Sequence, residues 1–466
     1  MALAFYLLLA LYLGRKNPVM YLLFPLALQQ GPGAFIDQTL SVSGKRIFSI
    51  YDTVFNDVLI LIILGLAVCF IKARFPRTDH AGSRLILAYL LYVSVLFLLN
   101  FIGAASPYEA FLTARDFLYI GLNYFLWLAI FSAATREDYE RFLRLMFFVT
   151  PFSAVLYILN SAGIVPIFPR EMAYSEIDYE LSSFLRDFAT MPFFLLMILV
   201  LSVQSLLTPI LKVPRYILLV NIGVLPIALL FTFTRSLVII AVMQLAVILC
   251  LNFTRHGASG IKNVLSFAAG CLFLLAPVYL VADIAFPNQV SYLTSRFTDA
   301  STEGKHEQNV DVRLAYLNKA IEITDYTSSA FGAGMNRTYY PQMNDIGAWK
   351  ADSTIPFLLY HTGWVGVGFL YLILIFFCID SAFLYYRTGD WFVAYLTSYF
   401  AATTVSSLIM GGGALYGSVW SFMNFAVFVV VRDGLWRKKP VLVPREWYGS
   451  VMQPQRPDPA NVHLTK

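Results

Sequence analysis

Residues 236–253 read SLVIIAVMQLAVILCLNF, an apolar run that contains no charged side chain. A helix needs about 20 such residues to cross the hydrocarbon layer of a membrane, and similar runs recur along the chain. Of the 466 residues, 59% are hydrophobic and only 13% are charged, whereas soluble domains carry about 25% charged residues. These proportions exclude a soluble globular protein and predict an all-α, polytopic membrane helical bundle.

Apolar segments separated by Pro, Gly or charged clusters number about 13, so we expect about 12–13 spans. They cover residues 2–13, 18–30, 53–71, 85–104, 117–134, 145–165, 188–210, 216–234, 236–253, 264–286, 354–379, 391–410 and 413–431. The chain then divides into an N-terminal membrane bundle (1–286), a large outer loop (287–353), three C-terminal spans (354–437) and a polar, Pro-rich tail (438–466). We expect this tail to be disordered and cytoplasmic.

The positive charges indicate the orientation of the spans. Alternate turns, together with the tail, hold 21 of the 33 Lys and Arg residues, and cytoplasmic loops are the ones enriched in these residues. The net charge of +5 is therefore explained by membrane topology and does not imply a nucleic-acid partner. The turns assigned to the cytoplasm lie around Arg15, Arg74, Arg141, Lys212, Lys262, Arg387 and Arg437.

The sequence offers no sign of a metal or cofactor site. All four cysteines lie inside apolar runs without short mutual spacing, so neither a disulfide nor a metal site is predicted. The chain has no Asp-X-Asp metal motif, no dinucleotide fingerprint and no phosphate loop. Acidic residues within the apolar runs lie near predicted helix ends, which argues against an ion-coupled transporter: Asp57, Asp283 and Asp380.

Two arginines on the outer side are candidate anion-binding groups. Arg235 lies in the run FTFTRS (231–236), which joins two apolar segments without a real loop, so its guanidinium is held at the membrane boundary. Arg313 opens a stretch, 311–323, whose apolar spacing predicts an amphipathic helix over the bundle, with Arg313 in its first turn. Guanidinium groups bind phosphate oxygens in a bidentate manner. The alternatives are a snorkelling Arg235 and an Arg313 paired with a neighbouring carboxylate.

The outer loop ends at Asp352 and Ser353, directly before the apolar run 354–379. Asp or Ser before an apolar run is a common helix start, so capping is one interpretation. A carboxylate at the outer mouth of a helix could also act as a general base, although nearby arginines would lower its pKa. Within the run, His361 is expected to be a hydrogen-bonded core or interfacial residue. The glycines of this region are expected to allow close packing: Gly332 and Gly334 in a loop turn, then Gly363, Gly366 and Gly368.

Four segments, in this order, resemble the superfamily of O-antigen ligases and Wzy-type polysaccharide polymerases. Arg186 opens the span after the smaller outer loop, and Thr-Arg-Ser at 234–236 links two spans. Arg313 opens a helix that runs into Gly332-X-Gly334, and Asp352-Ser353 is followed nine residues later by Gly363-X-X-Gly366. The likeness covers residues 186–380. Ligases hold His at the position of Asp352, so the polymerases are the better match.

The resemblance implies an all-helical glycosyltransferase fold of the C type with one large periplasmic loop. It also implies a polymerase that joins undecaprenyl-diphosphate-linked repeat units of O-antigen or exopolysaccharide at the periplasmic face of the bacterial inner membrane. The transfer would be inverting and would use no metal or cofactor. Arg235 and Arg313 would hold the diphosphate leaving group, Asp352 would orient or deprotonate the acceptor hydroxyl, and Arg186 would support the donor. Further candidate substrate contacts are Arg296, Ser353 and His361.

Two other functions stay open at this point. The first is a ligase that moves a finished glycan to another acceptor. The second, of a different class, is a flippase of lipid-linked sugar, which would place its cations in a central cavity and would lack a large outer loop. The partners expected for a polymerase are the lipid-linked oligosaccharide, the bilayer and a chain-length regulator.

Overall fold

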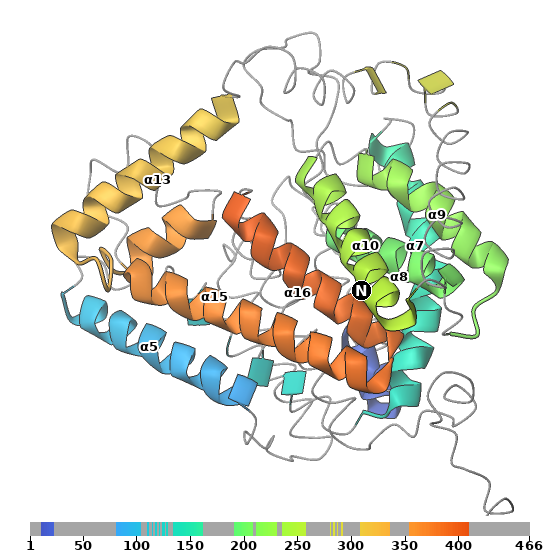
Figure 1. Cartoon of the computed structure of the whole chain (residues 1–466), viewed down its shortest axis with the longest axis horizontal. Helices are drawn as coiled ribbons and strands as arrows, with labels where there is room; N and C mark the ends of the chain where they lie inside the picture. Colours follow the sequence, from blue (N-terminus) through green and yellow to red (C-terminus); the bar gives the residue numbers. More distant parts are fainter. Residues whose placement is uncertain are drawn as a thin grey trace, which may run out of the picture.

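The computed structural model describes residues 11–22, 81–103, 134–161, 191–207, 211–230, 235–257, 308–335 and 354–409, with single positions between 110 and 128 and between 280 and 291. Within these ranges every regular element is a helix, which confirms the predicted all-α class (Figure 1). Among the described residues, four helical stretches are long and apolar enough to cross a membrane: Ala81–Ile102, Arg136–Leu159, Leu237–Arg255 and Thr354–Thr388. The chain is thus a helical membrane protein.

Most predicted spans in the described ranges coincide with helices. The elements are η1 (Pro18–Leu22), α5 (Ala81–Gly103), α7 (Arg136–Ser161), α8 (Met191–Leu207), α9 (Arg215–Leu230), α10 (Arg235–His256), α13 (Gln308–Thr327), α15 (Thr354–Thr388) and α16 (Trp391–Ile409). The helix α13 is the amphipathic helix predicted in the outer loop. The predicted spans 53–71, 264–286 and 413–431 and the tail 438–466 lie wholly or almost wholly outside the described residues.

The helix α7 begins at Arg136, earlier than the predicted residue 145. Local hydrogen bonds and ion pairs between the polar side chains of its first turns stabilise this start. The Thr135 N–H donates to Asp138 Oδ2 (2.9 Å), and the Asp138 N–H donates back to Thr135 Oγ1 (3.3 Å). This reciprocal pair is a capping box. One turn further, Arg136 pairs with Glu140 (3.1 Å) at the i,i+4 spacing that favours helix.

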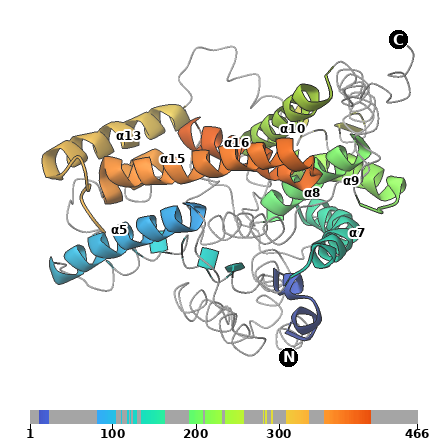
Figure 2. The same cartoon turned by 60° about the horizontal axis from the view of Figure 1, so that its bottom comes forward.

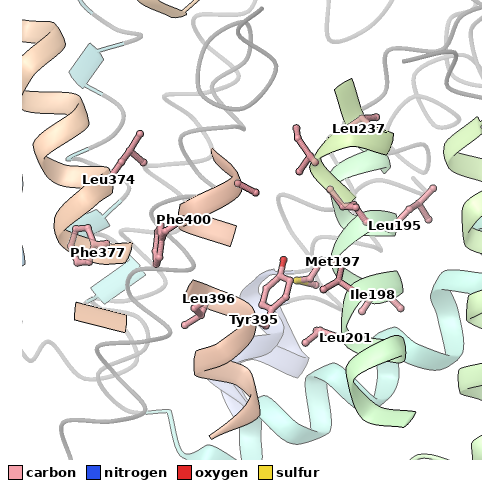
Figure 3. Close-up of a cluster of buried hydrophobic side chains, with 14 of the residues drawn as sticks. Leu195, Met197, Ile198, Leu201, Leu237, Leu374, Phe377, Tyr395, Leu396 and Phe400 are labelled. Atoms are coloured by element: carbon pink, nitrogen blue, oxygen red, sulfur yellow. The ribbon is translucent and has the colours of Figure 1, made fainter. Parts of the chain in front are cut away.

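The helices α8 and α16 form the centre of the bundle. Residues 195–205 of α8 and 391–398 of α16 are all buried, so these two stretches are enclosed by protein on every side. Figure 3 shows Tyr395 of α16 facing Met197, Ile198 and Leu201 of α8, whereas Leu396 points away from α8. Transfer of one such side chain from water into a protein interior contributes about 1.5–3 kcal/mol. In a membrane, close packing rather than water exclusion holds such helices together.

Turns that the sequence assigned to the cytoplasm meet at one end of the bundle. Arg136 Nη2, at the start of α7, lies 3.1 Å from Asp390 Oδ2, between α15 and α16. Arg255 Nη1, at the end of α10, donates to the Tyr385 carbonyl oxygen (2.9 Å). Gln204 Nε2, near the end of α8, donates to the Trp391 carbonyl oxygen (2.8 Å). We call this the basic end of the bundle.

Asp390 fixes the turn between α15 and α16 at the basic end. Its Oδ1 accepts the Phe392 N–H (2.9 Å), which caps the first turn of α16. The side chain is only 4% exposed, whereas that of Arg136 is 42% exposed. Burial raises the pKa of Asp390 to about 6, although Arg136 and the capping N–H groups lower it. The turn therefore carries a buried carboxylate whose charge one cation only partly offsets.

The helix directions place the start of α10 at the opposite end. Because the end of α10 and the start of α16 both lie at the basic end, these two packed helices are antiparallel. Arg235 therefore lies at the end of the bundle where α16 finishes. Figures 1 and 2 both show α13 and the first part of α15 at a distance from the basic end. We call the side of the bundle opposite the basic end, where α10 begins and α16 finishes, the far end.

Candidate functional site

The helix α15 is broken near its start by Gly363. This residue has φ 61° and ψ −169°, which divides α15 into a half-helix (Thr354–Thr362) and a long remainder. The break is visible in Figure 1 at the end of α15 nearest to α13. Such a backbone conformation is essentially confined to glycine. The predicted role of Gly363 in close packing thus takes the specific form of a kink.

The turn that follows α13, residues 328–335, fills the break in α15. The Trp364 N–H donates to the Ser329 carbonyl oxygen (3.0 Å), and the Val365 N–H donates to that of Ala330 (3.2 Å). In the other direction, the Ala333 N–H donates to the Tyr360 carbonyl oxygen (2.7 Å). The kink exposes backbone groups that an unbroken helix would use internally, and the turn satisfies three of them.

Glycines on both sides make this contact possible. Gly332 has φ 71°, and a Cβ atom there would lie 2.5 Å from the Tyr360 carbonyl oxygen and 2.7 Å from the Gly363 nitrogen. A Cβ at Gly363 would in turn overlap the Ala330 carbonyl group. The two glycine motifs that the sequence singled out therefore touch each other, and the close backbone approach predicted for Gly332 is confirmed. Gly368 is different, because a Cβ there would meet nothing within 4 Å.

The contact sets the register between α13 and the half-helix. Thr324 Oγ1 donates to the Leu359 carbonyl oxygen (3.4 Å), and the pairs Ser329–Trp364 and Ala330–Val365 follow with the same offset of 35 residues. The two segments are therefore parallel. Figures 1 and 2 both show α13 beside the first part of α15.

One face of α13 packs on the bundle, as its amphipathic pattern predicts. Ala320 and Ile323 are buried, whereas Asn318, Glu322 and Asp325 are exposed. The helix begins at Gln308, so the predicted position of Arg313 in the first turn is wrong. Arg313 is the sixth residue, and it lies beyond the N–H groups that have no partner at a helix start. By the 35-residue offset, the start of α15 is level with position 319, about 9 Å along α13 from Arg313.

His361 lies inside the packing of the half-helix. It is fully buried, and its ring is close to those of Phe117, Phe357 and Tyr360, with centroids 5.8, 4.8 and 4.6 Å away. Its Nδ1 lies 2.9 Å from the Gly334 carbonyl oxygen. Because a carbonyl oxygen only accepts, Nδ1 carries the proton. This agrees with the expected core role and leaves substrate contact through His361 without support.

The other predicted site residues are placed only in part. Arg235 is the first residue of α10 and Arg313 lies within α13, but their side chains lie outside the described part of the structure. The remaining predicted residues also lie outside the described residues: Arg186, Arg296, Asp352 and Ser353. In the sequence, Asp352 and Ser353 directly precede Thr354, the first residue of the half-helix.

Sequence reasoning missed residues that support the kink. Tyr92 of α5 donates its hydroxyl to the Thr362 carbonyl oxygen (2.5 Å), one residue before the break. Its ring also approaches that of Phe331 in the turn (centroids 6.3 Å apart). A single Tyr within an apolar span gives no signal of such a role. Thr354 was also missed, and its hydroxyl is fully buried at the start of the half-helix.

Comparison of the chain with models of known protein families and with characterised proteins found no match. Among the residues that the structure describes, no three His, Cys, Asp or Glu side chains gather in a way that could hold a metal ion. The geometry of the described residues therefore brings together the helix α13 and the glycine-linked half-helix of α15, whereas α10, which begins with Arg235, packs mainly on α16 and α8.

Proposed function

We propose that this protein is a polysaccharide polymerase, a glycosyltransferase that joins lipid-diphosphate-linked oligosaccharide repeats at the periplasmic face of the bacterial inner membrane. The glycine-linked contact between α13 and the half-helix is the observation that carries the proposal. It fixes the helix that holds Arg313 against the segment that Asp352 and Ser353 precede. Two segments distant in sequence, each with a proposed role in transfer, thus pack directly against each other.

The difference between the two ends of the bundle supports this assignment. The predicted cytoplasmic turns meet at the basic end through Arg136 and Arg255, whereas α10 begins with Arg235 at the far end. A lipid-linked diphosphate lies at the depth of the membrane boundary, where a helix that begins with arginine can reach it. The far end is then the face that receives the substrate.

The proposed transfer is a single displacement at the anomeric carbon. The acceptor hydroxyl oxygen of one lipid-linked repeat attacks the anomeric carbon of the other, and the bond from that carbon to the diphosphate oxygen breaks. The bonding electrons leave with undecaprenyl diphosphate, and the hydroxyl proton passes to the Asp352 carboxylate and then to solvent. Arg235 and Arg313 stabilise the negative charge on the leaving group, an effect worth several kcal/mol in the transition state.

The test uses purified full-length protein in vesicles with an undecaprenyl-diphosphate-linked repeat unit and without nucleotide or added metal. We expect a ladder of polymer that Arg313→Ala and Asp352→Ala abolish. Arg141→Ala is the matched control, because this exposed arginine at the basic end pairs only with Glu137 (2.6 Å) among the described residues. Its ladder should equal that of the unchanged protein.

Other outcomes assign other functions. Glycan that appears on an added lipid acceptor, without a ladder, would identify a ligase. Sugar that crosses the vesicle membrane without forming a new bond would identify a flippase. Either result would contradict the proposed polymerase.

A further inference from the structure

The N-terminus of the half-helix forms an unusual helix start, because it is enclosed by protein. Thr354 is its first residue and is fully buried, and residues 358–363 are buried as well. The ring of Phe357 stacks on Phe117 with centroids 5.2 Å apart. The positive end of the helix dipole, equivalent to about half an elementary charge, therefore lies within the molecule rather than in water.

This end offers hydrogen-bond donors. The first residues of any helix have N–H groups without a carbonyl partner one turn back, and here these include Thr354 and Ile355. Pro356 follows and has no N–H group, so its place in the first turn adds no further donor. Backbone N–H groups at a helix start are a general binding feature for phosphate oxygens.

The hydroxyl of Thr354 is a second, independent indication of a ligand. Its Oγ1 is buried and has no hydrogen-bond partner among the residues that the structure describes. Burying a hydroxyl without a partner is costly, so such a group normally has one in the functional state. By contrast, the buried hydroxyl of Thr362 at the other end of the same half-helix donates to the Leu358 carbonyl oxygen (2.8 Å).

We propose that the N-terminus of this half-helix is a phosphate site that binds the diphosphate group through the N–H groups of Thr354 and Ile355 and the Thr354 hydroxyl. The inference rests on the proposed function and deepens it, since it assigns the leaving group to backbone and hydroxyl donors in addition to arginines. The start of α15 at Thr354 supplies the site, and the kink at Gly363 sets the direction of this half-helix relative to the rest of α15.

Thr354→Val tests the site, because valine has nearly the same shape as threonine and carries a methyl group in place of the hydroxyl. The probe is inorganic pyrophosphate, whose binding to the purified full-length protein is followed by phosphorus NMR. Loss of a hydrogen bond to a charged group should weaken binding about ten- to a hundredfold. Thr354→Ser, which keeps the hydroxyl, should bind as the unchanged protein does.

Thr362→Val is the matched control, since its hydroxyl already has a partner and lies at the other end of the half-helix. It should leave pyrophosphate binding unchanged. Equal binding by Thr354→Val and the unchanged protein would overturn the proposal, as would an equal loss in Thr354→Val and Thr362→Val, which would indicate a structural effect. No binding by the unchanged protein would also overturn it.

The outcome is separable from that of the proposed function. Pyrophosphate binding that depends on Thr354, in a protein that forms no polymer, would support the phosphate site and refute the polymerase. A polymerase whose KM for the lipid-linked donor is the same in Thr354→Val would refute the phosphate site and leave the polymerase standing.

Discussion

Replacement of Gly363 by Ala tests the contact on which the site depends. The backbone at φ 61° and ψ −169° would cost about 1–3 kcal/mol for a residue with a Cβ atom. The new Cβ would also overlap the Ala330 carbonyl group and lie 2.6 Å from the Gly332 nitrogen. Both neighbours are backbone atoms, so they cannot rotate away as a flexible side chain could.

The chain can respond in two ways, and the smaller cost decides the result. It can keep the kink and accept the strain, or it can release the turn at residues 328–335. Release removes three backbone hydrogen bonds, each worth about 0.5–1.5 kcal/mol. We therefore expect Gly363→Ala to lower the free energy of unfolding by about 2–3 kcal/mol.

Gly368→Ala is the matched control on the same helix. Gly368 lies within the regular part of α15, and a Cβ there would meet no atom within 4 Å. Alanine is favoured over glycine in a helix by about 1 kcal/mol, so this variant should be slightly more stable than the unchanged protein. The two substitutions, five positions apart, should shift stability in opposite directions.

The assay is unfolding in mixed micelles titrated with SDS and followed by circular dichroism. A protein with Gly363→Ala that is as stable as the unchanged protein would refute the kink and its contact with the turn. So would a shift of the same sign for both variants.

Three further predictions concern single contacts. Gly332 has φ 71°, and the Cβ added by Gly332→Ala would lie 2.5 Å from the Tyr360 carbonyl oxygen. This variant should lower the free energy of unfolding by about 1–3 kcal/mol in the same assay, and an unchanged midpoint would contradict the close approach. Tyr92→Phe removes one hydrogen bond to the kink and should lower the free energy of unfolding by about 0.5–1.5 kcal/mol, with an unchanged value counting against that bond. Asp390 has a folded-state pKa of about 6 against an ordinary 3.8, so the folded protein binds its proton more tightly than the unfolded chain. Its contribution to stability is present below about pH 4 and falls by roughly 3 kcal/mol as the pH rises to about 6. Asp390→Asn should abolish this part of the pH dependence of unfolding, and an identical pH profile in both proteins would contradict the assignment.

Much of the fold follows from the sequence because membrane helices need long apolar runs. The run 236–253 falls within α10, and the apolar spacing around Ala320 predicts the buried face of α13. Helix ends were less predictable, since the charged start of α7 depends on local pairs that hydropathy does not record. The glycine pattern at Gly332 and Gly363 indicated close packing, but the kink depends on a partner segment that lies about 30 residues away.

Contacts between distant segments were beyond sequence reasoning. Nothing in the sequence links Arg136 to Asp390, because the pair depends on how the start of α7 meets the turn between α15 and α16. The same holds for Tyr92 and the Thr362 carbonyl oxygen. Conversely, the proposed roles of Arg235, Arg313 and Asp352 come from sequence pattern, and the structure adds only the elements that carry or adjoin them.

The most direct test of the proposed polymerase counts its products. Purified protein in vesicles is supplied with a lipid-diphosphate-linked repeat unit, and the released undecaprenyl diphosphate is compared with the new glycosidic bonds. The proposal predicts one lipid diphosphate for each bond formed. Release of lipid diphosphate without new bonds, or no release at all, would contradict it.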